Sequence, residues 1–155
     1  MIEILQAETA EEIEAARILF REYEAWLGLD LCFQGFEEEL AGLPGKYAKP
    51  EGRLLLALAD KKAAGCIGFR KIEEGVCEMK RLFVRPEFRS LGLGKKLIEK
   101  LIEEAKIAGY ERMRLDTYPP KMGNAVQLYE SKGFREIPPY YHNPYGETLF
   151  MELVF

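Results

Sequence analysis

Residues 78–100 read E-M-K-R-L-F-V-R-P-E-F-R-S-L-G-L-G-K-K-L-I-E-K. Residues 79–84 have the pattern of a β-strand, residues 89–95 form a basic turn with two glycines, and an apolar-periodic helix follows. Glycines at a helix start let the backbone approach a ligand closely. The unpaired N–H groups of the first turn point outward, with the positive end of the helix dipole behind them. This order of strand, loop and helix predicts an anion site, suited to a phosphate or pyrophosphate.

Three kinds of phosphate-binding turn differ in the spacing of their glycines. A P-loop needs G-x-x-x-x-G-K-[ST], but the G-K pair that starts at Gly94 is followed by Lys96. A dinucleotide-binding turn needs G-x-G-x-x-G, and no glycine follows Gly94 at the required position. The spacing that fits is R-x-x-G-x-G, at Arg89, Gly92 and Gly94, directly after a strand that ends V-R-P. The alternative is that the two glycines only ease a strand-to-helix turn.

The R-x-x-G-x-G turn resembles the coenzyme A pyrophosphate loop of the GNAT family of N-acetyltransferases. A second stretch, G-N-A-V-Q-L-Y-E-S-K-G-F at residues 123–134, contains N-x-x-x-x-Y-x-x-x-G-F and looks like the second cofactor motif of that family. The resemblance covers nearly the whole chain and is specific from Glu78 to Phe134. It implies acetyl-CoA, and hence coenzyme A, as the cofactor.

Hydrophobic periodicity and turn signals predict the remaining elements. Thr9 and Glu12 form a capping box, and Gly28 is the expected end of the first helix. We expect strands at residues 2–5, 53–59, 64–71, 76–84, 112–117, 134–137 and 147–154, and helices at residues 10–27, 36–41, 97–108 and 125–131. This order predicts an α+β fold. The resemblance implies a GNAT-like mixed, mostly antiparallel sheet flanked by helices, whose parallel central strands, residues 76–84 and 112–117, splay apart to admit the pantetheine arm.

Length and composition set further limits. A chain of 155 residues with 48% hydrophobic and 31% charged residues is expected to form a single domain, residues 1–155. The N-terminus has no basic leader and no segment is long enough to span a bilayer, so we expect a cytoplasmic protein and no membrane contact. Three cysteines without C-x-x-C spacing and one histidine, His142, argue against a disulfide framework, a metal centre or a Ser-His-Asp hydrolase.

The charges are unevenly distributed along the chain. Residues 1–40 hold eleven acidic and two basic side chains, whereas residues 80–100 hold seven basic and two acidic ones. The basic patch suits a phosphorylated cofactor, and the acidic half could attract a cationic substrate or could be a solvated helix face. Nucleic-acid binding is not expected of this acidic protein. Edge strands and an apolar carboxyl-terminal strand are compatible with a homodimer.

Acetyl transfer to an amine needs a group that takes up the proton of the ammonium ion, because an alkylamine has a pKa near 10.4. The resemblance places a general-base glutamate at the position of Glu78, and strand alternation predicts that it shares a face with Lys80, Leu82 and Val84. The alternative is that Glu78 pairs with a neighbouring basic side chain.

The resemblance also assigns the cofactor contacts. Leu82, Phe83 and Val84 lie along the pantetheine arm, with main-chain groups of Leu82 and Val84 bonding its amides. The pyrophosphate turn consists of Arg89, Ser90, Leu91, Gly92, Leu93, Gly94 and Lys95. Asn124 bonds the pantetheine arm, and Tyr129 stands by the sulfur as general acid. The alternatives are a helix N-cap for Asn124 and a core aromatic for Tyr129.

The acceptor side is expected to include Phe33, Tyr140 and Tyr141, with core packing as the alternative for Phe33 and its neighbours Phe36 and Tyr47. The predicted function is an acetyl-CoA-dependent N-acetyltransferase that acts on a primary amine of a small molecule or peptide by direct attack in a ternary complex. The alternative is a non-catalytic acyl-CoA-binding sensor, which needs only the glycine turn.

Overall fold

The computed structural model describes residues 1–155, except for the side chain of Phe33, so the predicted acceptor-side role of Phe33 lies outside the described residues. The elements follow in the order β1 (Ile2–Gln6), α1 (Ala10–Leu27), η1 (Cys32–Gln34), α2 (Phe36–Ala41), η2 (Gly45–Tyr47), β2 (Arg53–Ala59), β3 (Lys62–Glu73), β4 (Val76–Val84), η3 (Pro86–Leu91), α3 (Leu93–Ile107), β5 (Arg112–Thr117), α4 (Pro119–Ser131), β6 (Arg135–Ile137) and β7 (Leu149–Val154), where η denotes a 3₁₀ helix.

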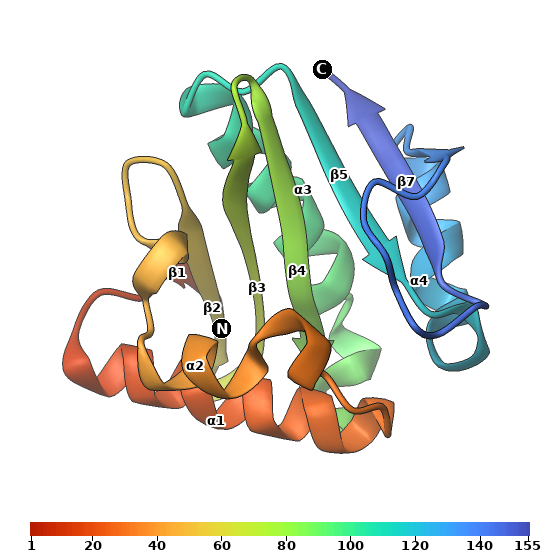
Figure 1. Ribbon diagram of the computed structural model, residues 1–155. Helices are drawn as coiled ribbons and strands as arrows, with labels where there is room; N and C mark the ends of the chain where they lie inside the picture. Colours follow the sequence, from red (N-terminus) through yellow and green to blue (C-terminus); the bar gives the residue numbers. More distant parts are fainter.

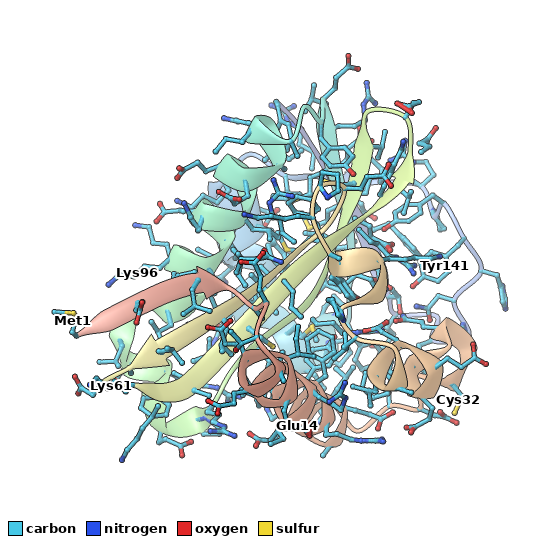
Figure 2. All side chains as sticks on the ribbon, turned by 90° about the vertical axis from the view of Figure 1, so that its left-hand side faces the viewer. Met1, Glu14, Cys32, Lys61, Lys96 and Tyr141 are labelled. Atoms are coloured by element: carbon cyan, nitrogen blue, oxygen red, sulfur yellow. The ribbon has the colours of Figure 1, made fainter. Side chains whose placement is uncertain are left out.

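In the part of the chain that the structure describes, seven strands form one sheet in the order β1-β2-β3-β4-β5-β7-β6. The β4–β5 pair is parallel and the other pairs are antiparallel. Helices α1 and α2 cover one face and α3 and α4 the other (Figure 1). Figure 2 views the molecule from the β1 side and shows Glu14 of α1 and Lys96 of α3 on opposite sides of the sheet. The predicted α+β fold is confirmed.

The parallel strands β4 and β5 separate along their length. Their pairing runs from Val76 to Met79 of β4. Beyond it, Arg81 has a φ of 64°, and the β3–β4 register shifts at this point, which marks a β-bulge. The last residues of β5, Asp116 and Thr117, pair with β7 but not with β4, and the two strands visibly diverge toward their carboxyl ends (Figure 1). The predicted splay is therefore present, and the bulge is its local cause.

The bulge also changes which face the β4 side chains occupy. Lys80 and Arg81, although consecutive, both contact the α1 side, where they lie near Tyr23. Leu82 and Val84 pack on the α3 side. Strand alternation had predicted Leu82 and Val84 on the face of Glu78 and Lys80. That prediction is wrong because the extra residue of the bulge reverses the alternation.

The two faces of the sheet carry separate apolar cores. The α1 side contains Leu19, Phe20 and Phe36, and the α3 side contains Phe69 and Leu97, all fully buried. Phe36 and Tyr47, considered for the acceptor side, belong to the first core and are 1% and 2% exposed. Their alternative assignment as core residues is confirmed.

Two helices begin earlier than predicted. Helix α3 begins at Leu93 rather than residue 97, because Gly92 adopts the left-handed conformation at its N-cap. Helix α4 begins at Pro119 rather than residue 125, since proline fits the first helical turn, and it kinks at Met122. The apolar strand β7 lies between β5 and β6, so its hydrophobicity matches its interior place in the sheet.

The bulge is held by a buried ion pair. Arg81 donates from Nε and Nη2 to the two carboxylate oxygens of Glu39 in α2, both at 2.9 Å, and from Nη1 to Gln34. The Arg81 side chain is 2% exposed and lies 5.0 Å from the ring centre of Phe36. Burial acts to raise the pKa of Glu39, but the hydrogen bonds and charge of Arg81 outweigh it and keep that pKa below its usual value.

We expect Glu39→Gln to lower the free energy of unfolding by about 3 kcal/mol, because it leaves a buried guanidinium without its counter-charge. Glu37→Gln is the matched control on the same helix. It breaks an exposed pair with Arg21 and should cost much less, because exposed ion pairs contribute little to stability. Equilibrium unfolding in urea measures both values, and equal losses in the two variants would contradict the role given to the buried pair.

Candidate functional site

A groove of about 650 Å³ opens between the carboxyl end of β4, the start of α3 and helix α4. We call it the α3–α4 groove. Of the residues predicted to bind the cofactor, nine line it: Leu82, Phe83, Val84, Arg89, Gly92, Gly94, Lys95, Asn124 and Tyr129. Ser90 and Leu91 are exposed in η3, and the side chain of Leu93 is buried in the core. The structure thus brings both sequence motifs to one groove.

The glycine turn leaves open space at the amino end of α3. A Cβ atom added at Gly92 would meet nothing within 4 Å, and one at Gly94 would meet only Leu128, at 3.9 Å. The N–H groups of the first helical turn, from Leu93 to Lys95, have no carbonyl four residues earlier within the helix. Because these donors and the helix dipole face unfilled space, the turn fits a phosphate group.

Arg89 lies across the same end of the groove. Its Nε donates to the main-chain carbonyl of Val84 at 2.9 Å, and its guanidinium stands 5.1 Å from the ring centre of Trp26 and 5.8 Å from that of Phe83. Among the described atoms, Arg89 makes this one side-chain hydrogen bond, and it uses Nε alone. The two terminal nitrogens therefore remain as donors for an anion.

Tyr129 lies at the inner end of the groove. It is 4% exposed, its ring packs 5.7 Å from that of Phe134, and its hydroxyl makes no hydrogen bond to another described side chain. Burial raises the pKa of this hydroxyl, and the negative charge of Asp116 adds to the rise. Tyr129 therefore keeps its proton at neutral pH and can donate it in a hydrogen bond. Asn124 lies inside α4, two residues after the kink at Met122, and not at the N-cap.

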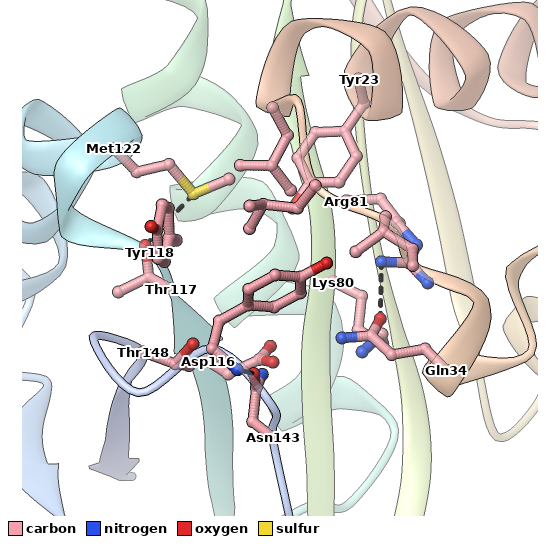
Figure 3. Close-up of a pocket in the computed structure, with 14 residues that line it drawn as sticks. Tyr23, Gln34, Lys80, Arg81, Asp116, Thr117, Tyr118, Met122, Asn143 and Thr148 are labelled. Atoms are coloured by element: carbon pink, nitrogen blue, oxygen red, sulfur yellow. Dashed lines mark hydrogen bonds between the residues drawn. The ribbon is translucent and has the colours of Figure 1, made fainter.

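A second pocket lies on the α1 side, where β4 and β5 diverge (Figure 3). We call it the splay pocket. One wall is largely apolar and comes from α1 and the segment after it; the floor comes from β4 and β5, and the outer wall from residues 143–148. The apolar wall contains Tyr23, Leu27, Leu29 and Leu31. The floor contains Lys80, Arg81 and Asp116, and the outer wall contains Asn143, Tyr145 and Thr148.

A narrow cavity joins the α3–α4 groove to the splay pocket. It shares Leu82, Met122 and Tyr129 with the groove. It shares Tyr23, Lys80, Arg81, Asp116 and Met122 with the pocket. The groove and the pocket therefore approach each other at this cavity, which both Tyr129 and Asp116 line.

Asp116 is a site residue that the sequence prediction missed. Its carboxylate accepts a hydrogen bond from the Tyr141 hydroxyl, whose oxygen in turn accepts one from Asn143 at 3.0 Å. Burial raises the pKa of Tyr141, and the charge of Asp116 raises it further, so this hydroxyl remains a donor. A signal was present in the sequence, because Arg112, Arg114 and Asp116 alternate along a strand predicted to splay.

Glu78 pairs with a neighbouring basic side chain, which was the alternative to its assignment as general base. It is 2% exposed, and it accepts hydrogen bonds from Arg70 at 3.1 Å and from the Tyr140 hydroxyl at 2.7 Å. Glu78 is not among the residues that line the groove, the splay pocket or the cavity between them. Lys80, two positions further along β4, does line the splay pocket and the cavity. The predicted general base therefore sits behind the site, in a buried network of basic and phenolic groups.

The predicted acceptor residues Tyr140 and Tyr141 also lie behind the splay pocket. Tyr140 bonds Glu78, and Tyr141 bonds Asp116, so both support carboxylates instead of lining the pocket. The aromatic residue of this segment that does line the pocket is Tyr145. His142 is exposed.

Two expected absences concern metals and membranes. Among the described residues, no cluster of three or more His, Cys, Asp or Glu side chains could hold a metal ion. Within the same residues, no helix has both the length and the apolar character needed to cross a bilayer.

Comparisons with known proteins agree with this geometry. The sequence pattern of the Acetyltransferase (GNAT) family matches residues 11–134. An uncharacterised N-acetyltransferase of Schizosaccharomyces pombe is 39% identical, over 98% of this chain and 94% of that protein. Another, from Dictyostelium discoideum, is 35% identical over 94% and 96% of the two chains. The chain belongs to the GNAT family of acetyltransferases.

Solved structures show the same fold. An acetyltransferase from Streptococcus agalactiae matches with a TM-score of 0.81 at 24% identity, over 99% of this chain and 98% of that one. The PaiA N-acetyltransferase from Thermoplasma acidophilum, solved in complex with coenzyme A, matches with a TM-score of 0.76 at 22% identity, over 100% and 99%. The family, enzyme class and acetyl-CoA cofactor predicted from the glycine turn are confirmed at the level of the family.

The glycine turn can be tested with one position. We expect Gly94→Glu to weaken binding of coenzyme A by at least about 100-fold, or about 2.8 kcal/mol, because a carboxylate would occupy the anion site. Gly94→Ala is the matched control. Its added carbon makes only an ordinary contact with Leu128, so binding should persist. Calorimetric titration with coenzyme A measures both, and undiminished binding by Gly94→Glu would show that the turn holds no phosphate.

Proposed function

We propose that this protein moves the acetyl group of acetyl-CoA to a primary amine of a small molecule or peptide, by direct attack in a ternary complex. The observation that carries the proposal is the cavity between the α3–α4 groove and the splay pocket, with Tyr129 and Asp116 on its walls. A groove for the cofactor and a pocket for the acceptor are needed at once in such a complex, and the cavity is where they meet.

Different residues of the groove bind different parts of the cofactor. The amides from Leu93 to Lys95 hold the pyrophosphate, with Arg89 adding charge, and Asn124 and the main chain of Leu82 and Val84 bond the pantetheine arm. The open space at Gly92 and Gly94 supports this fit. When bound, acetyl-CoA supplies an acetyl group activated as a thioester.

Asp116 acts on the amine. An alkylammonium ion has a pKa near 10.4, so it enters the pocket charged and is attracted to this carboxylate. Asp116 takes one proton from the ammonium ion and passes it to solvent, which frees the nitrogen lone pair before the N–C bond forms. Glu78 acts as a positioning residue, because it holds Lys80 and Tyr140 and does not reach the cavity.

Tyr129 acts on the leaving group. As the C–S bond breaks, its hydroxyl donates a hydrogen bond to the sulfur, which finally carries the second proton of the former ammonium ion. A phenol with a pKa raised by burial stays protonated, so hydrogen bonding to the sulfur is more important than full transfer of the phenolic proton.

The cysteines support direct attack without an acetyl-enzyme. Burial raises the pKa of Cys77 to about 12 and also raises that of Cys66, and both thiols bond main-chain carbonyls. Cys32 is exposed, and the neighbouring Asp30 raises its pKa. None of these described thiols lines the groove, the splay pocket or the cavity. A nucleophilic cysteine needs the opposite, a lowered pKa next to the substrate.

We expect Tyr129→Phe to lower kcat by about 100-fold or more, with little change in the affinity for coenzyme A, because it removes only the donor to the sulfur. Tyr110→Phe, which loses a bond to the remote carbonyl of Glu51, is the control and should keep full turnover. The assay uses the amine of a panel that the wild type acetylates fastest. If acetyl-CoA binds but no amine is acetylated, the sensor alternative is correct.

We expect Asp116→Asn to lower kcat/KM by about 100-fold, because an amide cannot accept the proton of the amine. Glu78→Gln should cost less than Asp116→Asn, since Glu78 acts through its neighbours. Steady-state kinetics on the two isosteric variants measure the difference. A larger loss in Glu78→Gln would return the role of base to Glu78.

A further inference from the structure

Lys80 is a buried cation in the floor of the splay pocket. Its side chain is 3% exposed, yet it lines both the pocket and the cavity that leads to the groove. Its Nζ lies 3.7 Å from Glu78, which is beyond hydrogen-bonding distance, and it makes no hydrogen bond to any described atom. An ammonium group carries three donors, and those of Lys80 are not used by a described protein acceptor.

The neighbouring cations are already satisfied. Arg81 has two hydrogen bonds to Glu39 and one to Gln34, and Arg70 bonds Glu78. Of the two described cations that line the splay pocket, Lys80 is thus the one whose donors are available to a ligand.

The opposite charge comes from Asp116 on the neighbouring strand. Burial lowers the pKa of Lys80 and the positive charges of Arg81 and Arg70 lower it further, while the negative charges of Asp116 and Glu78 oppose this shift without reversing it. Glu39 neutralises the charge of Arg81, and Glu78 neutralises that of Arg70. The floor of the pocket therefore presents one positive group, Lys80, and one negative group, Asp116 (Figure 3). Such a floor is complementary to a zwitterion.

The remaining wall is apolar. Leu27, Leu29 and Leu31, from the end of α1 and the segment after it, face this floor across the pocket. An alkyl or aryl group in contact with them would be removed from water, which is favourable.

We propose that the acetyl acceptor is an α-amino acid with an apolar side chain. Lys80 donates hydrogen bonds to its carboxylate, Asp116 accepts one from its ammonium group, and the leucine wall contacts its side chain. This inference rests on the proposed acetyl transfer, whose step is unchanged: the N–C bond forms, the C–S bond breaks and the ammonium loses two protons. Lys80 adds recognition of the carboxylate.

The inference differs from the cationic acceptor considered for the acidic amino-terminal half. Several acids of that half are used by the protein itself, since Glu22 pairs with Arg85 and Glu37 with Arg21, in addition to the buried pair of Glu39. The splay pocket therefore does not inherit the negative charge of residues 1–40.

Matched pairs of acceptors provide the test. L-leucine and 3-methylbutylamine differ only in the carboxylate, as do L-phenylalanine and 2-phenylethylamine. We expect the wild type to favour each amino acid over its amine in kcat/KM by roughly 10- to 100-fold, the value of a charge-assisted hydrogen bond. Lys80→Met should bring that ratio close to one. Glu78 keeps Arg70 and Tyr140 as partners in this variant, and thermal unfolding checks that it folds.

A binding measurement complements the kinetics. L-leucine is titrated by calorimetry into protein saturated with coenzyme A, for the wild type, Lys80→Met and the exposed control Lys46→Met. We expect Lys80→Met alone to lose binding.

The outcomes separate the inference from the proposed function. Amines acetylated as well as their amino acids, or a preference that survives Lys80→Met, would overturn the inference and leave acetyl transfer intact. Bound acetyl-CoA with no transfer to any acceptor would overturn the proposed function. In that case, leucine binding that depends on Lys80 would still support recognition of the carboxylate, and absence of leucine binding would refute it.

Discussion

The structure depends on a single residue in an unfavourable backbone conformation. Arg81 adopts a left-handed conformation that costs a non-glycine residue about 1–2 kcal/mol. Glu39, 42 positions earlier in the chain, holds it there through two hydrogen bonds inside an aromatic surrounding. Without this contact β4 could continue its parallel pairing with β5, and the gap between the two strands would close.

The same bulge separates two kinds of surface. Past Arg81, β4 turns apolar side chains toward α3 and α4, where the groove suits a long cofactor with a phosphate at one end. Before it, Lys80 faces the opposite side, where α1, the segment after it and residues 143–148 surround a charged floor. One change of register thus allows a single strand to line both the groove and the splay pocket. Buried ionisable groups also gather under this part of the sheet, where Arg81 and Glu78 bond partners from other elements.

Local patterns accounted for much of this molecule. The capping box at Thr9, the exact limits of β2, β4 and β5, and both cofactor motifs follow from signals within a few residues. The bulge did not, because Arg81 lies in an ordinary strand sequence and is displaced by a distant glutamate. For the same reason the predicted face of Leu82 and Val84 was wrong. Asp116 and Lys80 line the pocket because the two strands separate there, which the sequence of either strand alone does not show. Glu78 was selected by its place in a motif, but Arg70 and Tyr140 enclose it.

The segment from residue 138 to residue 148 has a consequence of another kind. It contributes Asn143, Tyr145 and Thr148 to the splay pocket, and the Tyr145 hydroxyl bonds Asp30 in the loop after α1. The outer wall of the splay pocket is therefore built from two irregular connections that are separate from the glycine turn and from α4. Substitutions and small insertions in these connections can alter which molecules enter while the parts that handle the nucleotide stay as they are. Evolution, or a protein engineer, can diversify this scaffold at one end without rebuilding the other.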